Sequence, residues 1–553
     1  MVSTSDKKEY KVIGTRPIRH DGYDKVTGRA QYGADIKLPG LVLGAVLRSP
    51  HAHAIIKNID TSEAEKIPGV LAVMTSDDLP RLDDVQRASS EESGSEKHLS
   101  ENVLAYKKVM YKGHAVAALA AIDQNTAEEA IKKIRVDYEV LEPVINVDQA
   151  MHKDAPIILE DFEADHLGKK VLNTNVALHE RYDFGDVEKG FSNSDFVLEK
   201  EVNMQTVHQG YIEPHNATAI WDEENRVKIW TSTQGSFVVR DSVSKVLGLD
   251  VSRVRVTPME IGGGFGGKIP IYLEPLAAIL SKKSRRPVKL VMTRTDVFEA
   301  TGPAPGGKVK VKLGVDSSGK MLAAKAVIKL EAGGFPEAFI EAASKCVFSC
   351  YDIPSTRIDG YDVIVNKPSS APYRAPGSPQ VAFAIETLVD EICSEKGWNP
   401  LEFRIKNVAR KGTRTALGPL YTRIGLEECL KAAEKSDHWK SKLDDNLSPG
   451  KKRGRGIASG YWFNIGFKSH VNLALNTDGT VALTEGSTDI GGTRASISMQ
   501  AAEVLGIPAE DVRPTVVDTD SIGYTDVTGG SRTCYATGYA AYLASQKLIQ
   551  EIE

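Results

Sequence analysis

The stretch Glu260-Ile-Gly-Gly-Gly-Phe-Gly-Gly-Lys268 places five glycines around one phenylalanine. Because glycine has no Cβ atom, this stretch predicts backbone that turns sharply and passes very close to a bulky group. A strand-like run at residues 254–257 precedes it, and an apolar run from Tyr272 follows it. Loops in such positions often present ligand sites, and their N–H groups can hold an anion. We therefore expect a cofactor-binding loop at residues 262–268.

The same glycines allow two other interpretations. Gly262, Gly264 and Gly267 have the G-x-G-x-x-G spacing of a dinucleotide-binding fingerprint. In that fold a helix begins within the glycines, whereas Pro270 and Pro275 follow here and delay or kink a helix. No acidic residue ends a second strand at the expected distance of about 20 residues. The pattern therefore disfavours a nicotinamide dehydrogenase, and a purely structural glycine turn is the second alternative.

An internal repeat is the next strong feature. Residues 217–255 predict a hairpin, a polar loop, a helix and a strand, and residues 471–513 repeat this order. Leu247 in the first copy aligns with Leu505 in the second, and each copy leads to a glycine loop. Agreement of element order over about 60 residues favours duplication over chance. A ligand is expected between the two glycine loops.

Length and composition limit the class of protein. A chain of 553 residues predicts about three to four domains. With 41% hydrophobic residues, 26% charged residues and a net charge of −5, the composition gives no reason to expect nucleic acid or an acidic membrane as a partner. No apolar signal core or membrane-spanning run is present in the sequence, so a cytoplasmic location is expected. The five scattered cysteines match neither a disulfide framework nor an iron–sulfur cluster.

These patterns predict an α+β protein with several domains. Residues 20–145 alternate strand and helix signals, which favours a small α/β domain after an N-terminal tail at 1–19. Residues 146–180 are rich in Pro, Asp and His and are expected to form a linker. The two copies of the repeat predict domains at 181–445 and 456–553, of which the second is incomplete.

Three motifs in combination resemble one known family. Thr231-Ser-Thr-Gln234, the glycine loop at 262–268 and Ala371-Pro-Tyr-Arg-Ala-Pro-Gly377 are similar to motifs of the molybdenum-binding large subunit of the xanthine dehydrogenase and aldehyde oxidase family. Thr488-Asp-Ile-Gly491 and residues 529–531 support the resemblance, which covers almost the whole chain. It implies an N-terminal hammerhead domain and two duplicated molybdopterin-binding domains, with molybdenum held through the pterin rather than directly by the protein.

The resemblance also implies which residues hold the cofactor. Gln234 matches the glutamine that hydrogen-bonds near the molybdenum oxo group, and Phe265 belongs to the loop packed against the metal ligands. Arg374 matches an arginine of the loop nearest the pterin. The other implied cofactor-binding residues are Gly264, Gly266, Gly491, Gly530, Ser531 and Thr533. An anionic pterin phosphate needs N–H, hydroxyl and guanidinium donors of this kind.

Departures from the family pattern concern the substrate pocket. Purine-oxidising members carry a glutamate directly after the lysine of the glycine loop, where this chain has Ile269. The substrate arginine of those members falls near Ala342, and Pro376 lies on a third loop near the expected pocket. These residues predict a pocket less polar than a purine site, so purine hydroxylation is not expected.

The implied activity is that of a molybdenum hydroxylase, which oxidises an electrophilic carbon of an N-heterocycle, aldehyde or related molecule with oxygen from water. The family's general base is a glutamate that we expect beyond Glu553, so no catalytic residue is assigned within the chain. The resemblance implies 2Fe-2S and FAD centres on partner subunits of a hetero-oligomer. The substrate and the nucleotide on the pterin, for example cytosine, stay open. A catalytically inactive carrier, a truncated sequence and a naturally split subunit are the alternatives.

Overall fold

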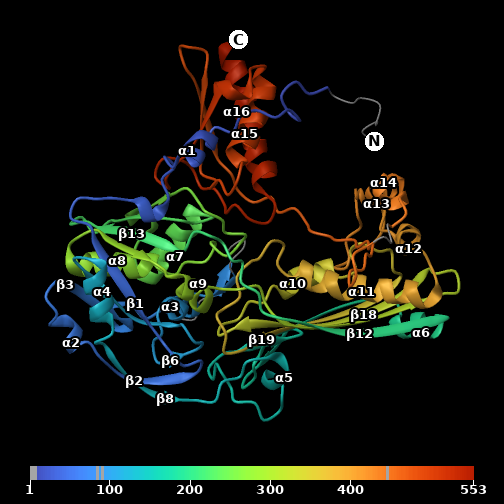
Figure 1. The fold of residues 1–553 in the computed structure, drawn as a ribbon, viewed down its shortest axis with the longest axis horizontal. Coiled ribbons are helices and arrows are strands. Elements are labelled where there is room, and N and C mark those ends of the chain that lie inside the picture. The colour runs from blue at the N-terminus through green and yellow to red at the C-terminus, as the bar shows by residue number, and fades with distance from the viewer. Residues whose placement is uncertain (1–8, 83–85, 89–92, 444–446) are drawn as a thin grey trace.

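The computed structural model describes residues 9–82, 86–88, 93–443 and 447–553. The chain forms three lobes: two are built on large sheets, and the C-terminal lobe with α15 and α16 stands above them (Figure 1). The first part of the predicted tail and the predicted domain end at 445 lie outside the described residues.

The first sheet combines strands from two expected domains. β1 pairs with β16 in parallel, with Val42 opposite Val288, so residues 20–145 share a sheet with the first copy of the repeat. Alternate faces of β7 are buried against different helices, which explains its unbroken alanine-rich run. In spatial order the strands are β15 (Val254–Pro258), β14 (Val227–Thr231), β13 (Asn216–Trp221), β16 (Val288–Val291), β1 (Val42–Arg48), β7 (Ala115–Ala121) and β3 (Val70–Thr75). The covering helices are α7 (Ser236–Leu247) and α8 (Glu274–Ser284) on one face, and α2 (Ser62–Glu65) and α4 (Gln124–Ile131) on the other.

The second sheet includes part of the expected linker. Residues 146–180 contain α5 (Val147–Ala150), the two outermost strands at one end of the sheet and the start of β11, so part of this stretch has regular structure. Their Pro, Asp and His content masked short strands at a sheet edge, where such residues are tolerated. The strands, in order, are β10 (Lys169–Val171), β9 (Ala164–His166), β11 (Val176–Phe184), β19 (Ser355–Ile364), β18 (Met321–Gly333), β17 (Gly307–Val315) and β12 (Phe196–Met204). Helices α10 (Ile340–Cys346) and α11 (Ser378–Lys396) pack on it, and α12 (Pro400–Asn407) follows.

The predicted duplication is confirmed by matching topology. In the C-terminal lobe, β20 (Val471–Leu475) and β21 (Val481–Glu485) form a hairpin, and α15 (Thr493–Leu505) leads to β22 (Val512–Val516). β21 and β22 pair in parallel, as β14 and β15 do in the first copy. α16 (Gly538–Ile552) packs on α15.

The described part of the expected N-terminal tail binds the C-terminal lobe. The Glu503 carboxylate on α15 accepts hydrogen bonds from the backbone N–H groups of Lys11, Val12 and Ile13. His20 Nε2 also lies 3.1 Å from the Ala509 carbonyl oxygen. Residues 9–20 are therefore hydrogen-bonded to the C-terminal lobe, although the two are far apart in the sequence.

The remaining elements are α1 (Gly22–Thr27), β2 (Ala54–Asp60), β4 (Gln86–Ala88), β5 (Ser93–Ser95), α3 (Glu96–Val103), β6 (Lys108–Val109), β8 (Arg135–Val140), α6 (Val187–Ser192), α9 (Arg294–Ala300), α13 (Leu426–Lys435) and α14 (Asp437–Lys440). They include a three-stranded sheet in the order β6, β2, β8 and the two-stranded pair β4 and β5. In the ranges that the structure describes, no helix has the length and apolar character needed to span a membrane.

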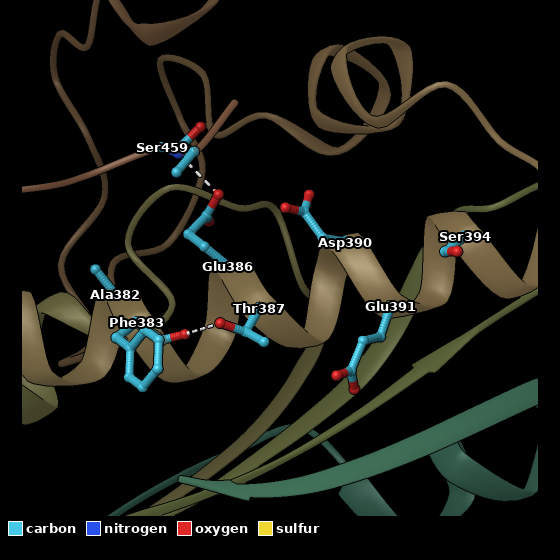
Figure 2. A pocket seen from close by; sticks show the side chains of 9 residues that line it. Ala382, Phe383, Glu386, Thr387, Asp390, Glu391, Ser394 and Ser459 are labelled. Atoms are coloured by element: carbon cyan, nitrogen blue, oxygen red, sulfur yellow. Dashed lines mark hydrogen bonds between the residues drawn. The ribbon is translucent and has the colours of Figure 1, made fainter. Parts of the chain in front are cut away.

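A buried ion pair joins α11 to α12 and to the segment entering the C-terminal lobe. The fully buried Arg404 Nε donates to Glu386 Oε2 at 2.8 Å, and the Ser459 N–H donates to the same oxygen at 2.7 Å. Tyr351 OH donates to the other oxygen of Glu386. Figure 2 shows Glu386 pointing from α11 toward Ser459, beside a pocket of about 450 Å³. None of the three cofactor-loop motifs lines this pocket.

Glu386→Ala is expected to destabilise the protein strongly because it removes the buried carboxylate partner of Arg404 and leaves only the half-exposed Asp390, 2.9 Å from Arg404 Nη2. Losing one partner of such a pair costs about 3–5 kcal/mol. Glu391→Ala on the same helix removes a partly exposed pair with Lys200 and should cost about 1 kcal/mol or less. Thermal unfolding midpoints of both variants measure the difference, and equal midpoints would contradict this account.

Candidate functional site

Gln234 joins the glycine loops of the two repeat copies. This residue lies between β14 and α7, and its side chain is buried. Gln234 Oε1 accepts the Gly266 N–H at 2.8 Å, and the Gln234 backbone N–H donates to the Lys268 carbonyl at 2.9 Å. Toward the other copy, Gln234 Nε2 donates to the Thr528 carbonyl at 2.9 Å, and the Thr528 N–H donates back to the Gln234 carbonyl at 2.8 Å. The two loops therefore meet, as the repeat led us to expect.

The third motif, residues 371–377, lies against the same loop. The Arg374 N–H donates to the Phe265 carbonyl at 2.8 Å. A Cβ atom on Gly266 would lie 2.3 Å from the Pro372 carbonyl oxygen, and one on Gly264 would lie 2.5 Å from Gln234 Oε1. These close approaches explain why both positions are glycine.

Strained backbone occurs in these loops. Phe265, Arg374, Ala375 and Ser531 have φ values of 56°, 36°, 67° and 59°, although none is glycine. Such conformations cost about 1–3 kcal/mol each and are typical of ligand-binding sites. Phe265 is 43% exposed, and Arg374, Ser531 and Gly491 are also exposed. The loops thus present backbone and polar groups outward instead of burying them in a core.

Asp489, in the loop before α15, accepts the backbone N–H groups at the start of that helix. Asp489 Oδ1 accepts the N–H groups of Gly491, Gly492 and Thr493, and Arg494 Nε donates to Asp489 Oδ2 at 2.9 Å. Burial acts to raise the pKa of Asp489, but the Arg494 guanidinium and the backbone N–H groups bring it down to about 2. The Gly491 N–H is therefore already bonded within the protein.

Polar groups on the second glycine loop remain available for a ligand. Thr533 begins a π-helical turn over Thr533–Thr537, a feature frequent at functional sites. Its buried Oγ1 has no hydrogen-bond partner among the described residues. Exposed Ser531 lies two residues earlier. Together with the exposed Arg374, these hydroxyl and guanidinium donors fit an anionic pterin cofactor.

The predicted pocket residues are not all alike. Ile269 is 1% exposed and packs with Val238 and Val527 beneath the glycine loop. Ala342 on α10 and Pro376 are both half-buried. Their segments are neighbours, since a Cβ atom on Gly377 would lie 2.8 Å from the Ala343 nitrogen. Their contribution to a substrate pocket stays a prediction.

Sequence reasoning missed several charged residues that support the loops. Arg532 is fully buried and donates to the carbonyl oxygens of Gly466, Asp526, Val527 and Lys468. Glu213 lies 2.6 Å from Lys268 Nζ beneath the glycine loop. Neither residue has a local sequence signature. The conspicuous Lys268 at the end of the glycine loop could have indicated that an acidic partner lies nearby.

Two histidines near the loop are hydrogen-bonded to neighbouring side chains. His215 Nε2 lies 2.7 Å from Tyr211 OH, and His208 Nε2 lies 2.8 Å from Thr301 Oγ1. Burial lowers the pKa of His208 to about 4 and that of His215 well below its usual range. The described ranges contain no group of three or more His, Cys, Asp or Glu that could hold a metal ion.

Family models match successive parts of the chain. The model "Aldehyde oxidase and xanthine dehydrogenase, a/b hammerhead domain" matches residues 27–142. Two models of the "Molybdopterin cofactor-binding domain" match residues 169–408 and 429–553. The fold is therefore a hammerhead domain followed by two molybdopterin-binding domains, as predicted.

Individual relatives agree with these matches. A probable xanthine dehydrogenase subunit of Bacillus subtilis is 30% identical over 93% of this chain and 67% of its own length. "Nicotinate dehydrogenase large molybdopterin subunit" of Eubacterium barkeri is 28% identical over 78% of this chain and 97% of its own length. The solved aldehyde oxidoreductase of Desulfovibrio gigas superposes with a TM-score of 0.87 at 25% identity, over 96% of this chain and 59% of that chain. The chain belongs to the xanthine dehydrogenase and aldehyde oxidase family of molybdenum hydroxylases.

Gly266→Ala is expected to lower stability because φ is 109° and the Pro372 carbonyl leaves no room for a Cβ atom. The strain amounts to about 1–3 kcal/mol. Gly460→Ala is the matched control, because nothing lies within 4 Å of its added Cβ atom. Thermal unfolding of both variants is the measurement, and a midpoint for Gly266→Ala equal to that of the control would refute the steric argument.

Glu485→Gln is expected to stabilise the protein at pH 8 but not near pH 4.5. Glu485 is fully buried with no hydrogen-bond partner for either carboxyl oxygen in the described structure. Burial, reinforced by Asp489 and opposed by Arg494, raises its pKa from 4.5 to about 8. Because the folded state holds the proton more tightly, the stability of the native protein falls between these two pH values. The gain in the variant is on the order of a few kcal/mol at pH 8.

Thermal midpoints of the wild type and Glu485→Gln, measured at intervals from pH 4.5 to 8, follow this gain. Glu223→Gln, in the exposed turn between β13 and β14, makes the same charge change as a control. A midpoint difference that stays constant with pH would show that Glu485 titrates normally.

Proposed function

We propose that this chain is the molybdenum-cofactor-binding catalytic subunit of a hydroxylase that acts on an electrophilic carbon. The observation that supports this most directly is the meeting of three loops: Gln234 joins the two glycine loops, and the third motif is hydrogen-bonded to Phe265 of the first. When bound, the cofactor would supply the redox chemistry and the activated oxygen.

The chain's own residues bind and orient that group. The amide of Gln234 carries two N–H bonds, of which one is used by Thr528, so the other can donate toward the cofactor. Arg374, Ser531 and Thr533 supply charge and hydroxyl donors for an anionic pterin, and exposed Phe265 can shield it from water. Gly264 and Gly266 let the backbone approach closely, and the Gly491 and Gly530 loops lie on the side of the second copy.

The finer assignments extend this proposal. The substrate class is an N-heterocycle, aldehyde or related molecule, bound near Ile269, Ala342 and Pro376. Electrons leave through 2Fe-2S and FAD centres on partner subunits of a cytoplasmic hetero-oligomer. The pterin carries a nucleotide such as cytosine. These features are typical of the family, and the relative named as a "large molybdopterin subunit" supports a multi-subunit assembly.

The general base is the deciding difference between an active enzyme and an inactive carrier. We propose that the loop residues above bind the cofactor and that a glutamate, assigned to none of those residues, supplies the general base.

The first test is the molybdenum content of the protein purified from its native host together with its partners. Elemental mass spectrometry should find close to one molybdenum per chain. Turnover of an aldehyde or an N-heterocycle by the same sample separates an active enzyme from a carrier. Folded protein without molybdenum, from a host that makes the cofactor, would overturn the proposal.

A further inference from the structure

A segment without regular secondary structure lies against the glycine loop. We call residues 209–215 the backing segment. Gln209, Tyr211 and Glu213 are turned toward the loop, while Ile212 between them is 88% exposed. Cβ atoms on Gly263 and Gly267 would lie 3.1 and 2.9 Å from Tyr211 atoms, so the loop rests directly on this segment.

Both ends of the loop are bound to one oxygen atom of Glu213. Glu213 Oε2 accepts the Gly262 N–H at 2.7 Å and the Lys268 ammonium at 2.6 Å. The Glu213 N–H in turn donates to the Gly262 carbonyl at 3.1 Å. A Cβ atom on Gly262 would lie 2.5 Å from the Glu213 Cβ, so the contact requires glycine there. The carboxylate therefore fixes the separation between residues 262 and 268.

Glu213 is the carboxylate partner of the buried Lys268. The Lys268 side chain is 0% exposed, and Nζ lies 5.1 Å from the centre of the Tyr211 ring. Burial lowers the pKa of Lys268, and the Glu213 carboxylate opposes this effect. An ammonium group buried this deeply is costly unless it is paired and hydrogen-bonded. Without the carboxylate, the end of the loop would have to move to bring the charge toward water.

The backing segment also holds the loop that carries Arg374. Gln209 Nε2 donates to the Pro372 carbonyl at 2.9 Å and to the Gly302 carbonyl at 3.1 Å. Side chains of the backing segment thus contact both cofactor loops of the first copy. The backing segment therefore helps to fix the distance between those two loops.

We propose that Glu213 is a positioning residue for cofactor binding, which holds the two ends of the 262–268 loop together so that Gly264, Phe265 and Gly266 keep the conformation that receives the cofactor. This inference rests on the proposed function. It assigns to Glu213 no contact with the cofactor and no proton transfer. Glu213 acts through the loop, as residues behind the direct ligands of a metal site do.

The test is the molybdenum content per folded chain in Glu213→Gln, purified with its partners like the wild type. Glutamine keeps a carbonyl oxygen but loses the charge, so molybdenum content should fall about 10- to 100-fold. Glu386→Gln is the matched control, because it weakens another buried ion pair, with Arg404, outside the loops. At a comparable loss of thermal midpoint, the control should retain its molybdenum.

The double variant Glu213→Gln with Lys268→Met separates positioning from stability. Removing both charges relieves the uncompensated ammonium, so the thermal midpoint should recover relative to Glu213→Gln. The loop ends are still untied, so molybdenum content should stay low. Wild-type molybdenum content in the double variant would overturn the positioning role of Glu213. So would a loss of molybdenum in Glu386→Gln equal to that in Glu213→Gln. Neither result would affect the proposed function. A wild-type protein without molybdenum would instead refute the proposed function.

Discussion

The buried amide of Gln234 is the contact on which the arrangement of the loops depends. A buried amide group is costly unless its donors and acceptor find partners. Gln234 finds them in two loops that belong to different copies of the repeat, through Gly266 and Thr528. Neither loop alone would satisfy the side chain, so forming this contact couples the first sheet to the C-terminal lobe. The backbone bonds of Gln234 to Lys268 and Thr528 strengthen the same coupling.

The other buried polar side chains near the loops act in a similar way. Irregular backbone inside a protein leaves N–H and C=O groups that must be paired. Asp489 pairs with the N–H groups before α15, Arg532 with the carbonyl groups around the second glycine loop, and Glu213 with the first. Each charge is thereby stabilised by backbone dipoles as well as by another side chain. This explains how loops without regular structure can keep one conformation around a site.

The sequence predicted the loops better than their supports. The glycines of 262–268 carry a local signature because their lack of a side chain is itself the requirement, and the repeat was visible from the order of its elements. Glu213 and Arg532 resemble ordinary surface charges in the sequence, since only the fold brings them to the loop backbone. The pairing of β1 with β16 joins residues 42 and 288, and no local pattern encodes contact over that distance. Short edge strands within 146–180 were missed for a related reason, because their composition is that of a linker.

The backbone strain at Phe265 and Arg374 indicates that their side chains have a role in binding. At Phe265 a glycine would adopt the observed φ of 56° without cost, and glycines already stand on both sides. The phenylalanine cannot offset this strain by filling the core, because 43% of it is exposed. Arg374 is similar, because its backbone is strained at φ 36° while the residue is exposed and gains nothing from burial. Strained, exposed, bulky residues on loops held from below make energetic sense when a bound group covers them and contributes the missing contacts.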